Sequence, residues 1–138
     1  MDKINSTLSI EQRELLDLHL RYVIEENKTT NLTRITDWET AKILHVEDSL
    51  VGVPFIEKAP QGDYLDMGTG AGFPGIPLKI YCPSLKVTLI DSLAKRLKFL
   101  ETVIIELGLK GIRCVHLRAE DAGRDPRHRE KYDLVTAR

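Results

Sequence analysis

Residues 66–75 read DMGTGAGFPG, and this glycine-dense stretch decides the expected fold. The residues just before the glycines, 64–67 (YLDM), form a short apolar run typical of a buried strand. Pro74 is compatible with the first turn of a helix over 74–81. Glycine allows a sharp turn at a strand end and a close approach to a ligand, with free amides at the start of the next helix. The stretch therefore predicts a strand–turn–helix unit that binds a cofactor.

The glycine spacing satisfies two different patterns. Gly70, Gly72 and Gly75 match the G-x-G-x-x-G of dinucleotide-binding turns, which hold a pyrophosphate. Gly68, Gly70 and Gly72 match a tighter G-x-G-x-G turn, with Asp66 two residues ahead of it. A carboxylate at Asp66 would repel a pyrophosphate and attract a cationic sulfonium cofactor with an amino-acid tail. Asp66 therefore favours the second pattern, and it would also fit a capping role in which it binds the turn amides.

A second acidic residue ends the next predicted strand. Residues 86–90 (KVTLI) are rich in β-branched side chains, and Asp91 follows them. A ribose-binding acid is expected at this distance after the glycine turn, because a carboxylate can accept hydrogen bonds from both ribose hydroxyls. The alternative is that Asp91 only caps the helix behind it.

Strands and helices alternate over the rest of the C-terminal part. Further strands are expected over 112–117 and 132–136, and a helix over 94–107 that closes at Gly108. The order strand, helix, strand, helix, strand predicts an α/β fold with a parallel sheet of about four strands. We therefore expect residues 61–138 to form the first part of a Rossmann-like domain.

Residues 1–60 instead indicate a helical segment. Ser9 with Gln12 forms a capping-box signal, and Thr36 with Glu39 repeats it ahead of a second helix that ends near Gly52. Apolar residues recur at helical spacing after both signals. The sequence therefore predicts an N-terminal helical segment, 1–60, in front of the Rossmann-like domain.

Composition limits the class of protein. The 138 residues are 42% hydrophobic and 30% charged, which is ordinary for a globular domain, and no apolar run approaches the about 20 residues that cross a bilayer. Cys82 and Cys114 lie far apart, so buried thiols, no metal site and a cytoplasmic location are expected. Basic residues cluster over 95–98 and 124–131, where they would either contact phosphates or form a solvated surface.

With these motifs in view, the chain resembles the RsmG (GidB) family, bacterial methyltransferases that form 7-methylguanosine in 16S ribosomal RNA. The GFPG after the turn is more specific than the turn itself. The similarity is carried by the collinear segments NLTRI (31–35), HVEDSL (45–50), LDMGTGAGFPGIPL (65–78), LIDS (89–92), the Lys95–Leu100 segment, RAE (118–120) and DLVTAR (133–138).

The resemblance implies a class I methyltransferase fold with S-adenosyl-L-methionine as cofactor. In the family the cofactor is held at the positions that match Gly68 and Phe73, by the Ala119-Glu120 pair and by the arginine that matches Arg138. Phe73 could instead pack in the core, and Glu120 could be a solvated surface residue. Together with the residues inferred from the turn, the expected cofactor-binding residues are Asp66, Gly68, Gly70, Gly72, Phe73, Asp91, Ala119, Glu120 and Arg138.

The implied reaction asks little of side chains. Ring nitrogen seven of guanine already has an available lone pair, so alignment of nucleophile, methyl carbon and sulfur can supply most of the catalysis, and we assign no general base. His45, Asp48 and Ser49 share a helix face by their spacing. A hydrogen-bonded structural cluster is expected there, with contact to RNA or to the catalytic cleft as the alternative.

The family continues beyond the arginine that matches Arg138, so the resemblance predicts a C-terminally truncated fragment. We expect such a fragment to bind the cofactor weakly and to methylate 16S ribosomal RNA, alone or in the small ribosomal subunit, poorly. Its fourth strand would be an apolar edge that can pair with another chain. Two alternatives stay open: a nicotinamide- or flavin-dependent oxidoreductase that uses the G-x-G-x-x-G pattern, and a non-catalytic cofactor-binding fragment. The sequence predicts no particular oligomeric state.

Overall fold

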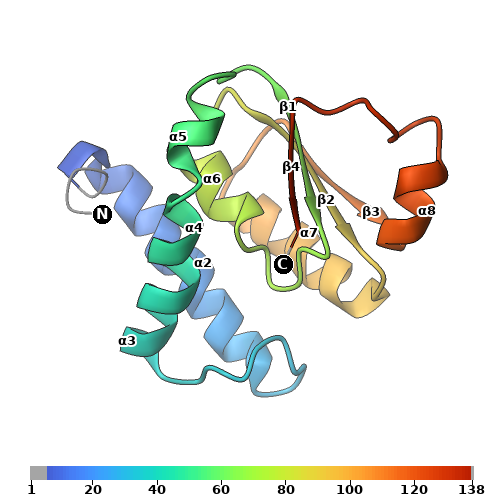
Figure 1. The fold of residues 1–138 in the computed structure, drawn as a ribbon. Helices are drawn as coiled ribbons and strands as arrows, with labels where there is room; N and C mark the ends of the chain where they lie inside the picture. The colour runs from blue at the N-terminus through green and yellow to red at the C-terminus, as the bar shows by residue number, and fades with distance from the viewer. Residues whose placement is uncertain (1–5, 138) are drawn as a thin grey trace.

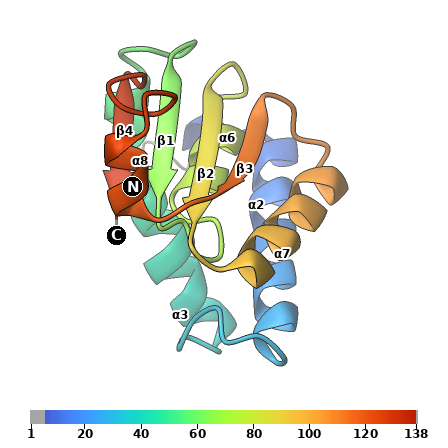
Figure 2. The same cartoon turned by 90° about the vertical axis from the view of Figure 1, so that its right-hand side faces the viewer.

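A four-stranded parallel sheet forms the centre of the fold. The computed structural model describes residues 6–137 (Figure 1), and the strand order β3-β2-β1-β4 is visible in Figure 2. All three neighbouring pairs are parallel, which confirms the predicted α/β fold. The strands are β1 (Asp63–Met67), β2 (Lys86–Asp91), β3 (Ile112–His116) and β4 (Leu134–Ala137).

The strand order places a crevice at the carboxyl ends of the strands. From β1 the chain moves outward to β2 and β3, and it then returns to place β4 on the other side of β1. Ligands of open α/β sheets bind beyond the carboxyl ends of the strands near such a reversal. The fold therefore directs attention to the residues that follow Met67, Asp91 and His116.

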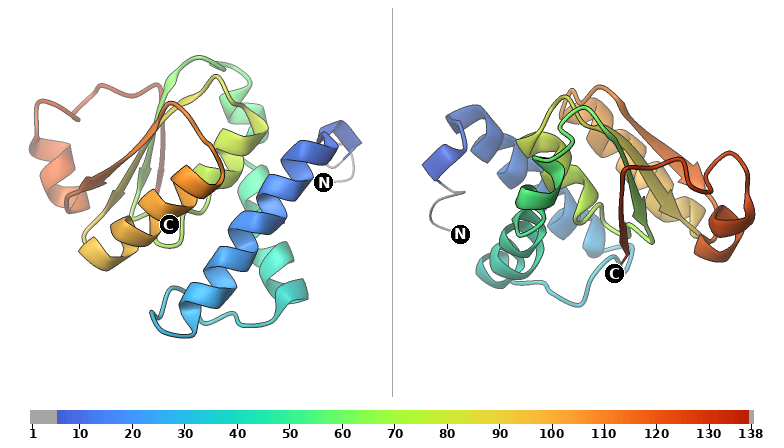
Figure 3. Two further views of the ribbon diagram at one scale, coloured as in Figure 1. Left: turned by 180° about the vertical axis from the view of Figure 1, so that it is seen from behind. Right: turned by 45° about the horizontal axis from the view of Figure 1, so that its top comes forward.

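Helices cover the two faces of the sheet unequally. One face packs against α6 (Gly75–Tyr81) and α7 (Ala94–Glu106), which lie between the sheet and the long helix α2 (Ile10–Asn27) (Figure 3). The other face carries only α8 (Ala119–Arg124) among the described residues, a short helix that the sequence pattern did not predict (Figure 1). The first face therefore holds the larger hydrophobic core.

Alternate residues of the strands enter two separate cores. Tyr64 and Leu89 enter the larger one, where they join Leu20 of α2 and Leu100 of α7. The smaller one, under α8, is built from Leu65, Ile90 and Ala122. Parallel strands are usually buried on both faces in this way. Because the larger core contains residues from both predicted units, the boundary between 1–60 and 61–138 is one of sequence pattern, and it stays a prediction as a domain boundary.

The N-terminal capping box is confirmed. Ser9 Oγ accepts a hydrogen bond from the Gln12 amide at 3.0 Å, and the Ser9 amide donates to Gln12 Oε1 at 2.8 Å. The Gln12 side chain also donates to the carbonyls of Ile80 and Tyr81, at 3.2 and 3.1 Å. These two carbonyls lie at the end of α6, where helix carbonyls lack intrahelical partners. The start of α2 thereby fastens the end of α6.

The second predicted capping box is wrong by one residue. Asp37 is the N-cap, and its carboxylate accepts from the Thr40 amide at 2.9 Å and from the Thr40 hydroxyl at 2.8 Å. Asp is a strong N-cap residue, so Asp37 takes this role from Thr36. The helix that follows is not regular, because a π-helical stretch interrupts it. Its parts are α3 (Trp38–Ala41), η1 (Lys42–Glu47) and α4 (Asp48–Leu50), and α5 (Val53–Ile56) follows.

The sheet has two exposed edges. β3 and β4 are the edge strands of the described sheet, and Val135 of β4 is 47% exposed. The expected pairing of this edge with another chain stays a prediction. Within residues 6–137, no helix combines the length and the apolar character that crossing a membrane requires.

Candidate cofactor site

The turn after β1 is built from glycines in left-handed conformations. Gly68, Gly70 and Gly72 have φ values of 65°, 59° and 99°, which residues with a Cβ rarely adopt. The Thr69 amide donates to the Ile90 carbonyl at 3.0 Å, and the Gly72 amide donates to the Thr69 carbonyl at 2.9 Å. The turn is therefore tied to the carboxyl end of β2.

The glycines of the turn face two different environments. A Cβ added at Gly68 or Gly70 would meet no atom within 4 Å. A Cβ at Gly72 would lie 2.6 Å from Cδ1 of Ile76 and 3.0 Å from Cδ2 of Leu100. A Cβ at Gly75 would overlap the Leu89 side chain and approach Asp66 Oδ2 at 2.9 Å. Gly68 and Gly70 thus face open space, whereas Gly72 and Gly75 face packed side chains.

Asp66 lies beneath the turn and is 1% exposed. Its Oδ2 accepts from the Thr69 hydroxyl at 2.8 Å and from the Gly75 amide at 3.0 Å. Its Oδ1 accepts from the Thr136 hydroxyl of β4 at 3.0 Å. The capping role considered for Asp66 is thus the one that the structure displays, and its carboxylate already fills the space at the start of α6.

Asp91 connects the turn to the start of α7. It is 2% exposed, and its two oxygens accept from the Gly70 amide and from the Leu93 amide, each at 2.9 Å. The Arg96 guanidinium lies 3.6 Å from Oδ1. Since each carboxylate oxygen has two lone pairs, Asp91 keeps acceptor capacity for a ligand. Capping and ribose binding are therefore compatible roles for this residue.

A pocket of about 410 Å³ opens beyond the carboxyl ends of β1, β2 and β3. It brings together four of the predicted cofactor-binding residues, namely Gly68, Asp91, Ala119 and Glu120, which come from three separate parts of the chain. The sequence motifs did not indicate the other lining residues as cofactor-binding. These are Ser92, Leu93, Arg96, Leu117 and Arg118.

The other predicted residues that the structure describes lie outside this pocket. Gly70 faces open space beside it and donates to Asp91, while Gly72 and Phe73 face the core. Phe73 is 5% exposed, so its side chain is a core residue, which was the alternative considered for it. Arg138 lies outside the described residues.

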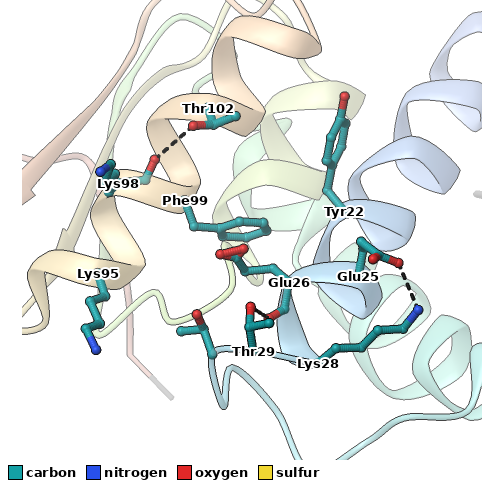
Figure 4. A pocket seen from close by; sticks show the side chains of 10 residues that line it. Tyr22, Glu25, Glu26, Lys28, Thr29, Lys95, Lys98, Phe99 and Thr102 are labelled. Atoms are coloured by element: carbon teal, nitrogen blue, oxygen red, sulfur yellow. Dashed lines mark hydrogen bonds and ion pairs between the residues drawn. The ribbon is translucent and has the colours of Figure 1, made fainter.

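A larger hollow of about 660 Å³ lies elsewhere, between the end of α2 and α7 (Figure 4). Its lining mixes acidic Glu25 and Glu26 with basic Lys95 and Lys98 of the predicted basic cluster. Among the described residues, no glycine of the turn and no predicted cofactor-binding residue lines it. Its size alone does not make it the better candidate, because no arrangement of its polar groups selects one ligand.

His45 and Ser49 form part of the structural cluster that their spacing predicts. The Ser49 hydroxyl donates to the His45 carbonyl one turn earlier in the chain, and Ser49 is buried. His45 Nε2 lies 2.9 Å from Thr33 Oγ1. Asp48 is exposed at the surface, whereas His45 is half-buried.

The cysteines do not resemble reactive or metal-binding residues. Cys82 and Cys114 are free and half-buried, so the expectation of buried thiols is wrong in degree. Burial, with a smaller effect of the Glu101 carboxylate, raises the pKa of the Cys114 thiol to about 11, which keeps it protonated. The described residues contain no group of three or more His, Cys, Asp or Glu side chains placed to hold a metal ion.

Comparison with known proteins identifies the family. The model of the family described as GidB, rRNA small subunit methyltransferase G, matches residues 12–138. Proteins named ribosomal RNA small subunit methyltransferase G from Lactobacillus acidophilus and Desulfitobacterium hafniense are 49% and 50% identical over 100% and 99% of the chain. The match covers 58% and 56% of these two relatives, so the chain spans somewhat more than half their length.

Solved structures support the fold. Two crystal structures of MtNAS, one in complex with MTA and tNA and one of a mutant, align with TM-scores of 0.53 at 16% identity. They cover 90% and 98% of this chain, which in turn covers 44% and 51% of those chains. At this level of identity the likeness shows the fold alone. Because the family model spans residues 12–138 and the curated relatives share about half of the aligned residues, the chain belongs to the rRNA small subunit methyltransferase G family.

Proposed function

We propose that this chain supplies the cofactor-binding part of an enzyme that transfers a methyl group from S-adenosyl-L-methionine to ring nitrogen seven of a guanosine in 16S ribosomal RNA. One observation carries the proposal. The open side of the glycine turn, at Gly68, and the Asp91 carboxylate line the same pocket as the Ala119-Glu120 pair. The family to which the chain belongs gives the reaction class.

The residues of the pocket fit an S-adenosyl nucleoside. Gly68 and Gly70 leave free the space that Cβ atoms would fill, which allows a ligand to approach the backbone. Asp91 would accept hydrogen bonds from the ribose hydroxyls, while the Ala119 amide and the Glu120 side chain would read the adenine edge. The pocket volume of about 410 Å³ lies in the usual range for small-molecule sites.

Asp66 would act on the cofactor through the turn. Its bonds to Thr69 and to the Gly75 amide hold the turn in one conformation, and its negative charge lies under the site. A buried carboxylate at this position favours a cationic ligand over an anionic one. We keep Arg138 as a proposed cofactor contact on the strength of the resemblance alone.

Catalysis would depend on positioning. Bound S-adenosyl-L-methionine supplies the methyl group, and the acceptor nitrogen of guanine already has a free lone pair. The residues of this chain therefore need to bind the nucleoside and orient it, and no side chain has to remove a proton before transfer. We accordingly propose no general base. The proposed macromolecular partner is 16S ribosomal RNA or the small ribosomal subunit, in the cytoplasm.

The geometry does not favour a dinucleotide at this turn. In the G-x-G-x-x-G pattern, the second glycine lets the backbone approach the pyrophosphate, and here that glycine would be Gly72. Gly72 instead faces Ile76 and Leu100. The Gly75 amide, at the helix start where a pyrophosphate would bind, already donates to Asp66. A nicotinamide or flavin dinucleotide would therefore meet both a filled space and a negative charge.

Calorimetry on the chain tests the cofactor assignment. We expect S-adenosylhomocysteine to bind and NAD to give no signal. Asp91→Ala should weaken S-adenosylhomocysteine binding by about tenfold or more, because the ribose loses its acceptor. Glu101→Ala, an exposed acid on α7, serves as the control and should leave binding unchanged. Binding of NAD in place of S-adenosylhomocysteine, or full affinity in Asp91→Ala, would contradict the proposal.

A methylation assay tests the reaction. Small ribosomal subunits that lack the modification are incubated with S-adenosyl-L-methionine and either this chain or the full-length Lactobacillus acidophilus relative, and 7-methylguanosine is measured by mass spectrometry. We expect the relative to methylate and the chain, which spans 58% of it, to do so more slowly. Cofactor binding without methylation by either protein would support the non-catalytic alternative.

A further inference from the structure

We propose that His19 of α2 is a positioning residue for the cofactor turn, and that the N-terminal helices are part of the cofactor site. The connection runs through three stacked rings, His19, Phe73 and His45, which we call the ring stack. The inference rests on the proposed function, in that it assumes the cofactor binds at this turn. It adds to that function a residue that no sequence motif indicated.

The Phe73 ring stacks with both histidines. Its ring centroid is 4.5 Å from that of His19, with an interplanar angle of 29°, and 4.7 Å from that of His45, with an angle of 11°. The three rings come from three parts of the chain, α2, the turn and η1. Because Phe73 directly follows Gly72, a shift of either histidine would be transmitted to the turn.

His19 also holds the turn by a hydrogen bond. Its Nε2 lies 2.9 Å from the carbonyl oxygen of Ala71, which is flanked by Gly70 and Gly72. A carbonyl can only accept, so Nε2 carries the proton and Nδ1 is left as an acceptor. His19 is 0% exposed. A fully buried ring therefore donates a hydrogen bond to the Ala71 carbonyl.

The Nδ1 atom of His19 indicates that the ring does more than fill space. It is buried and has no hydrogen-bond partner among the described residues. A buried polar atom without a partner is unfavourable, and phenylalanine would fill a similar volume without this disadvantage. The donor at Nε2 is the property that phenylalanine lacks, and that donor is directed at the turn.

The turn needs such external support. Three of its residues are glycines with positive φ, and glycine loses more conformational entropy on ordering than any other residue. A site that is held in its binding conformation before the ligand arrives binds more tightly. Asp66 and Asp91 hold the turn from the sheet side, and His19 holds it from the side of the N-terminal helices.

The other end of the ring stack is fastened as well. His45 Nε2 is hydrogen-bonded to Thr33 Oγ1 at 2.9 Å. Asn27 Oδ1 accepts from the amides of Leu32 and Thr33, at 2.8 and 2.9 Å, which orders the loop between α2 and α3. The N-terminal segment therefore contacts Phe73 through both histidines, one from α2 and one from η1.

Variants of His19 separate the bond from the ring. His19→Phe keeps an aromatic ring in the stack and removes the donor, whereas His19→Gln keeps a donor nitrogen and removes the ring. Val23→Ala, one turn further along α2 and also 0% exposed, is the control for loss of packing alone. Calorimetry with S-adenosylhomocysteine gives the affinity, and thermal unfolding of the same samples gives Tm.

We expect His19→Phe to bind S-adenosylhomocysteine about tenfold more weakly or worse, with a Tm at or above that of the wild type. His19→Gln should recover part of the affinity despite a lower Tm. Val23→Ala should lower Tm and leave the affinity unchanged below its unfolding temperature. Wild-type affinity in His19→Phe, or an affinity that simply follows Tm across the three variants, would overturn the assignment.

A measurement without cofactor separates this inference from the proposed function. Hydrogen exchange of the amides over residues 70–73, followed by mass spectrometry, should be faster in His19→Phe than in the wild type and unchanged in Val23→Ala. Unchanged exchange in His19→Phe would overturn the positioning role whatever the ligand. Faster exchange combined with no binding of S-adenosylhomocysteine by the wild type would support the positioning role and reject the proposed cofactor.

Discussion

The two sides of the glycine turn are built on different physical requirements. On the open side, Gly68 and Gly70 face space in which even a methyl group would meet nothing within 4 Å. On the packed side, Gly72 and Gly75 are so close to Ile76, Leu89 and Leu100 that a methyl group would collide with them. The same residue type thus leaves open space on one side and allows close packing of α6 and α7 on the other.

The acidic and basic side chains around the turn also divide between the open side and the packed side. Asp91 lines the pocket on the open side, whereas Asp66 is enclosed on the packed side with Thr69 and the Gly75 amide. His19 approaches from the packed side as well. A substitution of Gly72, Gly75 or Asp66 should therefore change stability first, and one on the open side should change ligand affinity first. His19 is the exception on the packed side, because its hydrogen bond to Ala71 positions the turn.

The largest expected effect is on the packed side, at Gly72. Gly72→Ala places a Cβ 2.6 Å from Ile76 at a φ of 99°, so overpacking and backbone strain add together. We expect a loss of about 4 kcal/mol in the free energy of unfolding, measured by urea denaturation. Gly123→Ala, where a Cβ would meet nothing within 4 Å, is the control and should be neutral or slightly stabilising. A small loss in Gly72→Ala would show that the packed side tolerates a side chain as the open side does.

The pH dependence of the free energy of unfolding tests whether water is excluded from the packed side. Burial lowers the pKa of His19 from 6.5 to about 4; the bond to Ala71 opposes this shift, and the charge of His45 adds to it. Between these values the unfolded chain binds a proton that the folded chain does not, so stability falls as the pH falls from 6.5 towards 4. The expected loss reaches about 3 kcal/mol and is absent above pH 6.5.

Urea denaturation at several pH values checks this expectation, with His19→Phe as the reference. Both proteins share every other titrating group, so the difference between their pH profiles isolates His19. A wild type whose profile runs parallel to that of His19→Phe would show that water reaches the ring.

A substitution of Asp66 tests whether this residue contributes to stability, as a packed-side residue, or to ligand binding, as an open-side residue. Asp66→Asn removes the charge from the hydrogen bonds with Thr69, Gly75 and Thr136, and we expect a loss of about 2 kcal/mol in the free energy of unfolding. Thermal unfolding of the ligand-free chain measures it. Unchanged stability together with lost S-adenosylhomocysteine binding would move Asp66 to the open side.

The smallest stability effect is expected on the open side. Gly70→Ala introduces a Cβ at a φ of 59° with no collision, so we expect a loss of only about 1 kcal/mol. The Cβ would occupy space beside the pocket, and calorimetry should show S-adenosylhomocysteine affinity reduced by about tenfold or more. If Gly70→Ala bound as well as the wild type, the open side would not be the ligand side.

Local patterns of sequence were sufficient for much of the fold. Apolar periodicity and glycine stops are local properties. They predicted three elements to within a residue or two, namely the strands over 64–67 and 86–90 and the helix over 94–107. The same holds for the Ser9 capping box. The second capping box was misplaced because Asp37 competes with Thr36 for the same role, and spacing alone does not rank the two. The helix α8 was missed because its sequence, AEDAGR, is short and contains a glycine.

The sequence by itself determined that a glycine turn with two acidic neighbours lies at the strand ends, since strand, turn and helix signals are read within a few residues of each other. Only the tertiary structure decided which side of the turn is open, that Asp66 is enclosed while Asp91 lines the pocket, and that Glu120 joins Gly68 there. It alone also brought His19 to Ala71, 52 positions further along the chain. A histidine in the buried stripe of a helix has the spacing of an ordinary core residue, so its partner becomes visible only when distant segments are packed together.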